Sequence, residues 1–273
     1  MRLRLLVLSA VAAAFLLPLA WTLLASFGVI PDDTTRPPSW TWPPTLQHFS
    51  EIGVAEPAFW QELGTSSLAA LGAAALGIAV AFPAAFGLAR SGIGASRTLT
   101  QAFLVLASLP PMAYVIPLSD LSRRAHLIDT FAGLTFAEAA VTAPLAVFVL
   151  YGAIAQLSPE WEEAALIDGA GLLRILRRVV LPLVAPSLAA TFLVLFVLDW
   201  NMLLVPLVLT SGEIKTVPVA LSDFFTFERE LDWPTAASAL VVSLAPLALL
   251  VAVFHRLLEG FALWGPATET SDE

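Results

Sequence analysis

Six long apolar segments, separated by shorter polar stretches, organise this chain. Each is close to the ~20 residues that an α-helix needs to cross the hydrocarbon core of a bilayer. Backbone groups in lipid have no water to bond, so each segment is expected to be helical. The pattern therefore predicts an all-α membrane protein with six transmembrane helices. Their approximate bounds are Leu5–Phe27, Leu63–Ala89, Leu99–Leu118, Phe131–Ile154, Leu188–Leu209 and Ala236–Leu258.

Prolines lie within most of these segments. A proline in a span leaves a backbone carbonyl that neighbouring protein must satisfy. We therefore expect bent helices that pack against other parts of the protein. The prolines are Pro18, Pro83, Pro110, Pro111, Pro144, Pro206 and Pro246.

The first apolar segment follows two arginines, Arg2 and Arg4, as in a secretory signal peptide, and Pro18-Leu19-Ala20 is a candidate cleavage region. The apolar run from Leu5 to Phe27 is longer than the ~7–15 residues typical of such peptides. We therefore favour an uncleaved first span over a cleaved signal peptide.

Composition narrows the class of protein. Hydrophobic residues make up 58% of the chain and charged residues 13%, with a mean hydropathy of +0.85. Soluble domains are roughly one quarter charged, so an ordinary soluble protein is excluded. There are no cysteines, and His48, His126 and His255 show no metal-ligand spacing. The net charge of −9 argues against a nucleic-acid partner.

Basic residues set the expected orientation. With the N-terminus inside, eight basic residues face the inside and five face the outside, which predicts that both termini are cytoplasmic. Arg123 and Arg124 fall outside, and we interpret them as helix-end arginines reaching lipid phosphates rather than as a topology error. The inner set is Arg2, Arg4, Arg90, Arg97, Arg174, Arg177, Arg178 and Arg256; the outer set is Arg36, Arg123, Arg124, Lys215 and Arg229.

A polar segment, residues 158–187, separates the fourth and fifth spans on the inner side. Ser158 and Pro159 predict a helix start, because serine accepts from free N–H groups and proline fits the first helical position. Ala164 and Ala165 are small enough to let another surface approach. Gly169 predicts a turn, because glycine adopts left-handed conformations readily.

A second helix is expected over Leu172–Val180, and three arginines share one face of it because they are three and four residues apart. Pro182 and Pro186 are expected to mark the return into the membrane. An ordinary interhelical loop with an amphipathic surface helix is the alternative. The arginines are Arg174, Arg177 and Arg178.

The spacing of Glu163-Ala164-Ala165, Gly169, Leu181 and Pro182 resembles the EAA signature of the membrane subunits of ATP-binding-cassette (ABC) importers. The resemblance covers most of the chain after residue 60 and is greatest to the smaller permease of maltose-type carbohydrate importers. Further similar segments are Gly64–Leu68, Phe86–Arg90, Leu127–Thr130 with Gly133-Leu134, Asp199–Asn201 with Pro206-Leu207, Thr216–Val219 and Asp232-Trp233.

This resemblance implies a binding-protein-dependent permease in a bacterial or archaeal plasma membrane, surrounded by lipid and without enzymatic activity or a cofactor of its own. It implies a second permease, giving a heterodimer, two ATPase subunits that bind ATP and Mg, and an extracytoplasmic substrate-binding protein. No GxxxxGK[ST] phosphate loop occurs in the sequence. The residues implied to contact the ATPase are Glu162, Glu163, Ala164, Ala165, Asp168, Gly169, Leu181 and Pro182.

The resemblance also suggests three regions. Residues 1–60 would hold the first span and an extracytoplasmic segment, which is either an irregular membrane cap or a docking surface for the binding protein. Residues 61–262 would form the permease core, and 263–273 a cytoplasmic tail. The sequence departs from the family at Gly64, where asparagine is usual, and at Gly260–Pro266, which replaces the usual ending.

Two acidic residues, Asp199 and Glu138, fall within predicted spans. Charges in the membrane centre are costly, so such residues usually face a cavity or a partner. We expect Asp199, with Trp200 and Asn201, to line a substrate pathway; a buried structural pair is the alternative. An ion-gradient-driven secondary transporter using Asp199 and Glu138 is the competing function, but it would have no use for an ATPase-docking loop. No nucleophile or metal motif supports an intramembrane enzyme.

Overall fold

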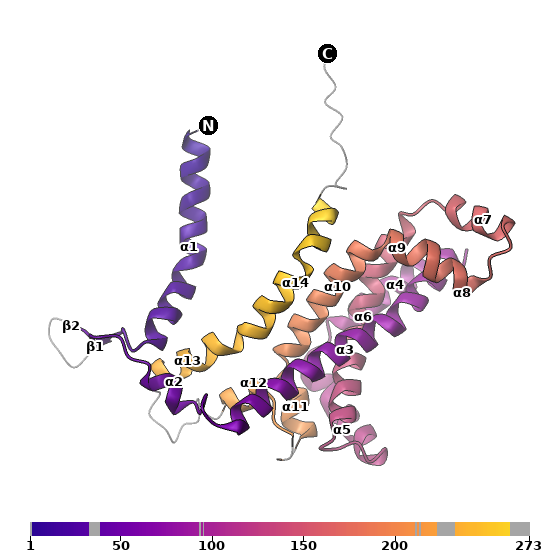
Figure 1. The fold of residues 1–273 in the computed structure, drawn as a ribbon. Coiled ribbons are helices and arrows are strands. Elements are labelled where there is room, and N and C mark those ends of the chain that lie inside the picture. Colours follow the sequence, from indigo (N-terminus) through magenta and orange to yellow (C-terminus); the bar gives the residue numbers. More distant parts are fainter. Residues whose placement is uncertain are drawn as a thin grey trace. The chain divides into compact units, whose positions relative to one another are not determined.

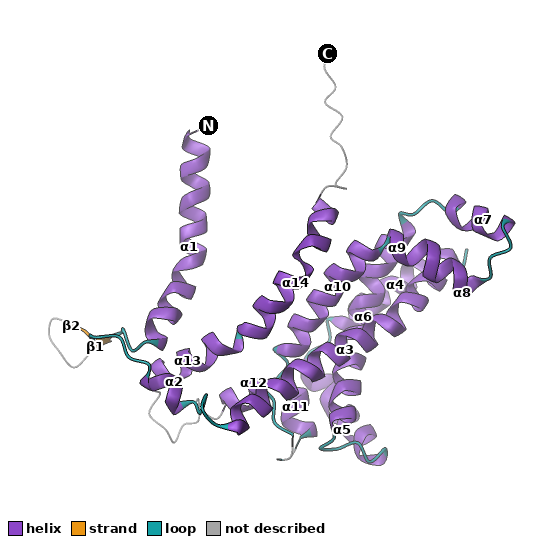
Figure 2. Ribbon diagram, in the orientation of Figure 1, coloured by secondary structure: helices purple, strands orange, loops and turns teal. Residues whose placement is uncertain are grey.

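The computed structural model describes residues 2–32, 39–92, 94, 96–210, 212, 214–222 and 233–262. Helices dominate this part of the chain, which confirms the predicted all-α class (Figure 2). The exception is a two-stranded antiparallel ladder, β1 (Pro31–Asp32) with β2 (Ser39–Trp40), only two residues long. The predicted tail, 263–273, lies outside the described residues.

Four helical segments are long and apolar enough to cross a membrane: Arg4–Ser26, Pro57–Arg90, Phe131–Ala155 and Trp233–Phe254. Two helix pairs that bend sharply could each contribute one further span. Ser96–Ala107 meets Pro111–Arg124 at 89°, and Leu172–Leu183 meets Ala185–Trp200 at 79°. The described part of the chain thus offers up to six spans if each bent pair counts as one.

Local chemistry explains the bend in the first pair and a break in another predicted span. Pro110 and Pro111 separate the first pair, because proline donates no backbone hydrogen bond and its ring disfavours a helical residue before it. The predicted fifth span, Leu188–Leu209, is also divided. Its helix ends at Trp200, Asn201 donates its side-chain amide to the Val197 carbonyl at 2.8 Å, and a separate short helix follows.

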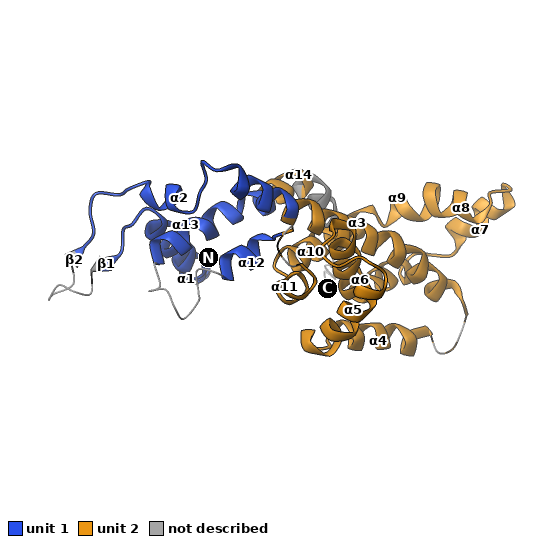
Figure 3. Cartoon of the chain, turned by 90° about the horizontal axis from the view of Figure 1, so that it is seen from below, with its two compact units in different colours: residues 1–65, 215–248 blue, residues 66–214, 249–273 orange. Residues whose placement is uncertain are grey.

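The chain divides into two compact units, residues 1–65 with 215–248 and residues 66–214 with 249–273 (Figure 3). Unit 1 contains α1, α2, the start of α3, α12, α13 and the first turn of α14; unit 2 contains the rest of α3 and α14 and the remaining helices (Figure 1). Their bounds are α1 Arg2–Ser26, α2 Gln47–Glu51, α3 Pro57–Arg90, α4 Ser96–Ala107, α5 Pro111–Arg124, α6 Phe131–Ala155, α7 Glu160–Ile167, α8 Leu172–Ile175, the π-helical segment η1 Leu176–Val180, α9 Leu181–Leu183, α10 Ala185–Trp200, α11 Leu204–Leu209, α12 Val217–Ser222, α13 Trp233–Ser243 and α14 Ala245–Ala262.

Unit 1 is held together where the end of α1 meets α13. Ser238 is fully buried and donates its hydroxyl to the Ser26 carbonyl at 2.9 Å. Thr235 of the same helix donates to the Glu51 carboxylate at 2.8 Å. The hydrogen bond from Thr235, with others from Gln47 and His48, lowers the pKa of Glu51, so this carboxylate stays ionised near neutral pH.

Unit 2 is built around α6, which packs against α4 and α10. Its buried side chains are apolar along most of the helix, as expected for a span enclosed by protein. Small residues on α3 allow close approach to it: a Cβ at Gly72 would lie 3.0 Å from Thr135 of α6. The largest fully buried apolar side chains of unit 2 are Phe196, Leu134, Leu150, Ile154, Leu195 and Leu209.

Candidate functional site

The polar segment between α6 and α10 forms a short helix, a turn and a second helix, all within unit 2 (Figure 1). The first helix, α7, starts at Glu160 and has three acidic residues in its first turn, which suits the positive end of a helix dipole. Pro159 occupies the cap position instead of the first helical position, so α7 begins one residue later than predicted. Ser158 accepts only one long hydrogen bond, 3.4 Å from the Glu160 amide.

The predicted glycine turn is present. Gly169 has a φ of +78°, a left-handed conformation that residues with a Cβ seldom adopt. Its amide donates to the Leu166 carbonyl at 3.0 Å, and the Ala170 amide donates to the Ala165 carbonyl at 2.9 Å. Together these bonds close the end of α7 in the manner of a Schellman cap.

The second helix is longer than the sequence suggested. Helix α8 continues through η1 and α9, so the helical run Leu172–Leu183 extends past Leu181 and Pro182. The return toward the membrane therefore occurs at Val184, just before Pro186, and not at Pro182. A π-helical segment such as η1 changes which side chains share a face and is often found at functional sites.

Large apolar side chains on α7 face solvent, although the segment is polar overall. Trp161 is 60% exposed, Leu166 58% and Ile167 87%. Glu163 and Ala164 are also exposed, whereas Ala165 is half-buried. We call Trp161, Leu166 and Ile167 the α7 patch. Exposed clusters of this kind commonly mark protein–protein contacts.

One predicted contact residue, Glu162, points into unit 2 instead. Its side chain is nearly buried and pairs with Arg90 at the end of α3. The Arg90 Nε donates to both carboxylate oxygens, at 2.9 and 3.0 Å, and Nη2 donates to Oε1 at 2.8 Å. Nη2 also reaches the carbonyls of Ile154 and Leu157, at 3.3 and 3.0 Å. Arg90 thus joins the end of α3, the end of α6 and α7.

The role of Arg90 was not apparent from the sequence. In the sequence, Arg90 is only one of the basic residues that indicate the membrane orientation of the chain, and the last residue of the segment Phe86–Arg90. The sequence does indicate that an ion pair could form here, because a basic residue ends a span on the same predicted side of the membrane as a loop with several carboxylates. Only the folded chain shows which carboxylate it binds, because Arg90 and Glu162 lie 72 positions apart.

The two intramembrane acids are brought together between α6 and α10. Glu138 is 2% exposed and Asp199 3% exposed, and they are close enough to interact electrostatically. Within the described residues, Glu138 Oε2 and both Asp199 carboxylate oxygens make no hydrogen bond of good geometry, although the Thr142 side chain lies close to Asp199. Trp200 is also buried, whereas Asn201 is exposed. Of the four predicted pathway residues, only Asn201 is open to the surroundings in this structure.

A tight loop before α6 gives a physical role to the segment Leu127–Thr130. Thr130 caps α6 by accepting from the Gly133 amide at 3.0 Å, and its hydroxyl donates to the Leu127 carbonyl at 2.8 Å. Asp129 has a φ of +54°, and its amide donates to the Leu209 carbonyl at 2.8 Å. The loop therefore ties the start of α6 to the end of α11.

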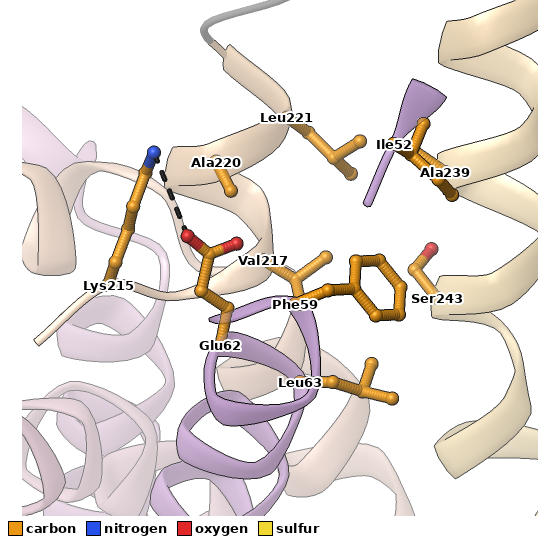
Figure 4. A pocket seen from close by; sticks show the side chains of 10 residues that line it. All are labelled: Ile52, Phe59, Glu62, Leu63, Lys215, Val217, Ala220, Leu221, Ala239 and Ser243. Carbon is orange, nitrogen blue, oxygen red and sulfur yellow. Dashed lines mark ion pairs between the residues drawn. The ribbon is translucent and has the colours of Figure 1, made fainter. Parts of the chain in front are cut away.

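Unit 1 contains an apolar pocket of about 230 Å³ between the starts of α3 and α12 and the helix α13 (Figure 4). Glu62 and Lys215 face each other at one side, with 3.9 Å between Oε1 and Nζ. The lining suits an apolar group better than a polyhydroxylated one. It consists of Ile52, Phe59, Glu62, Leu63, Lys215, Val217, Ala220, Leu221, Ala239 and Ser243.

Several apolar spans joined by a structured polar loop define a multi-pass membrane protein. Residues 2–261 match the family "Binding-protein-dependent transport system inner membrane component", and the chain belongs to this family of ABC importer permeases. This confirms the resemblance drawn from the EAA spacing.

Individual relatives agree with this assignment. The ABC transporter permease protein ORF1 of Streptomyces antibioticus is 35% identical over 218 residues, which cover 80% of this chain and 95% of the relative. The trehalose/maltose transport system permease MalG of Thermococcus litoralis is 27% identical, covering 92% of each chain. A chain from a bacterial ABC transporter that imports alginate has the same fold, with a TM-score of 0.72 at 18% identity, covering 93% of this chain and 94% of that one.

Proposed function

We propose that this chain forms half of the translocation pathway of an ABC importer for a carbohydrate and couples transport to ATP hydrolysis by partner subunits. Membership of the permease family supports the importer role. Similarity to a trehalose/maltose permease supports the substrate class. The chain would act with a second permease, two ATPase subunits that bind ATP and Mg, and an extracytoplasmic binding protein.

The observation that carries the coupling proposal is the α7 patch on a rigidly held helix. Its three apolar side chains are exposed, while Arg90 and the Gly169 turn fix the helix at both ends. Exposed aromatic and aliphatic side chains are typical anchors of protein interfaces. A helix held in this way would move with the spans as a unit, as transmission of a conformational change requires.

Replacing Ile167 with glutamate is expected to prevent association with the ATPase without unfolding the chain. Ile167 is 87% exposed, so its replacement disturbs no packing within the chain. A buried charge without a partner would, however, be costly in a docked interface. We expect at least a roughly fivefold loss in the amount of ATPase subunit recovered by co-purification, since one such group costs roughly 1–3 kcal/mol. Glu163→Lys is expected to act in the same direction.

The control is Trp42→Glu, which changes another strongly exposed apolar residue outside the segment 158–187. It should leave ATPase recovery unchanged. Normal recovery with Ile167→Glu would contradict the docking role of α7. Uptake by the chain alone in proteoliposomes, driven by an ion gradient without ATP, would contradict the ABC mechanism itself.

We further propose that substrate passes beside α6 and α10, where Glu138, Asp199, Trp200 and Asn201 supply polar and aromatic groups. Carboxylates and amides can bond sugar hydroxyls, and an indole can pack on a sugar ring. The unpartnered oxygens of Glu138 and Asp199 support this role, because buried carboxylates without partners are unusual outside functional sites.

Asp199→Asn is expected to reduce the uptake rate at least tenfold, or to change substrate preference, while the assembled complex is recovered in normal yield. The matched control is Thr191→Val, two turns earlier in α10, where a buried hydroxyl donates only to the Ser187 carbonyl. Uptake of radiolabelled sugars by proteoliposomes measures the uptake rate and the substrate preference of each variant. Unchanged uptake and selectivity in Asp199→Asn would leave the buried pair a structural role only.

A further inference from the structure

Three arginines of α8 and η1 form a basic cluster that the coupling function does not explain. Arg174, Arg177 and Arg178 are exposed, and none forms an ion pair with another described residue. They are three of the 13 basic residues in a chain of net charge −9, and they fall within five positions. A local concentration of positive charge in an acidic protein calls for an anionic partner.

The cluster lines a hollow in the surface. Arg174, Arg177 and Arg178, together with Gly171, Leu172 and Leu173, surround an open space of about 580 Å³. Guanidinium groups bind phosphate oxygens with paired hydrogen bonds, and several converging on one space favour a phosphate over a single carboxylate.

The direction of the helix places this hollow at a membrane surface. Leu172–Leu183 meets Ala185–Trp200 at 79°, and the second helix belongs to a candidate span. A helix that leaves a span at nearly a right angle runs along the membrane plane. Leu172 and Leu173 are each 62% exposed. Exposed leucines beside exposed arginines are typical of a helix lying in the lipid headgroup region.

We propose that Arg174, Arg177 and Arg178 bind the phosphate of an anionic phospholipid at the membrane surface. The leucines contact the adjacent acyl region, and the long arginine stems allow the guanidinium groups to reach the headgroup. Anionic lipids attract basic groups close to the membrane surface. This role is independent of the ATPase and would hold for the chain by itself.

The test uses the full chain, purified in detergent, stripped of lipid and mixed with phosphatidylglycerol or phosphatidylcholine. Native mass spectrometry counts the retained lipids. The wild-type chain is expected to retain phosphatidylglycerol over phosphatidylcholine, and the triple variant R174Q/R177Q/R178Q should lower this preference roughly tenfold or more. The variant R174K/R177K/R178K keeps the charge and should retain an intermediate preference, because lysine lacks the paired donors.

The control, R4Q/R97Q, removes charge from two exposed arginines outside the hollow and should keep most of the preference. A comparable loss in this control and in R174Q/R177Q/R178Q would overturn the site, because the effect would then follow net charge alone. Unchanged lipid preference in R174Q/R177Q/R178Q would also overturn the proposed lipid site. If this variant also lost ATPase co-purification, the arginines would be assigned to a protein contact instead. Failure of the ATPase-docking test at Ile167 would leave this result untouched.

Discussion

Replacing Arg90 with methionine is expected to destabilise unit 2 and abolish ATP-driven transport. The change leaves the Glu162 carboxylate nearly buried without its cation and removes a donor from the carbonyls of Ile154 and Leu157. Removing one partner of a buried ion pair costs about 3–5 kcal/mol, and the residual exposure of this pair favours the lower end. Titration with sodium dodecyl sulfate in bicelles measures the loss of stability, and proteoliposome uptake measures function.

The order of the single variants distinguishes this role from a simple charge effect. Glu162→Gln should cost less than Arg90→Met, because glutamine still accepts from Arg90 and the arginine keeps its two carbonyl acceptors. The double variant should be no less stable than Arg90→Met alone, because glutamine leaves no buried charge, and the coupling energy should be about 1–3 kcal/mol. Additive losses would show that Arg90 and Glu162 act separately, and α7 would then owe its position to other contacts.

The elements that the sequence predicted well are those with a local cause. Apolar runs of the right length gave the spans, because the bilayer imposes helicity on each run independently. The turn after α7 was also predictable, because a glycine after a short helix favours the left-handed cap that Gly169 adopts. In both cases the deciding residues are neighbours along the chain.

What the sequence could not show depends on packing between distant segments. The 79° bend occurs at Val184, two residues after Pro182, which lies in the last turn of the helical run Leu172–Leu183. The partner of Arg90 and the burial of Glu138 against Asp199 likewise follow from how α3, α6, α7 and α10 meet. Similarity at Leu127–Thr130 marked a family segment but did not reveal that it forms a tight loop.

Replacing Gly133 with alanine is expected to disrupt the connection between α5 and α6. A Cβ at this position would overlap the carbonyl oxygen of Leu127 and lie 2.8 Å from its carbon. Because the obstructing atoms belong to the backbone, no side-chain rotation relieves the clash. The same carbonyl accepts the Thr130 hydroxyl, so moving it also disturbs the cap of α6. We expect the free energy of unfolding to fall by about 3 kcal/mol or more, which is at or above the upper end of the range usual for overpacked sites.

Two variants separate this clash from a general effect of substitutions in α6. Gly152→Ala lies in the same helix, where a Cβ would meet nothing within 4 Å. It should leave stability unchanged or raise it by up to about 1 kcal/mol, because alanine is the better helix former. Thr130→Val removes the cap and the hydrogen bond to the Leu127 carbonyl, and should cost about 1–2 kcal/mol. If Gly133→Ala proved as mild as Gly152→Ala, the loop from Leu127 to Gly133 would have to shift freely. The tie between Asp129 and Leu209 would then contribute little to holding α6 against α11.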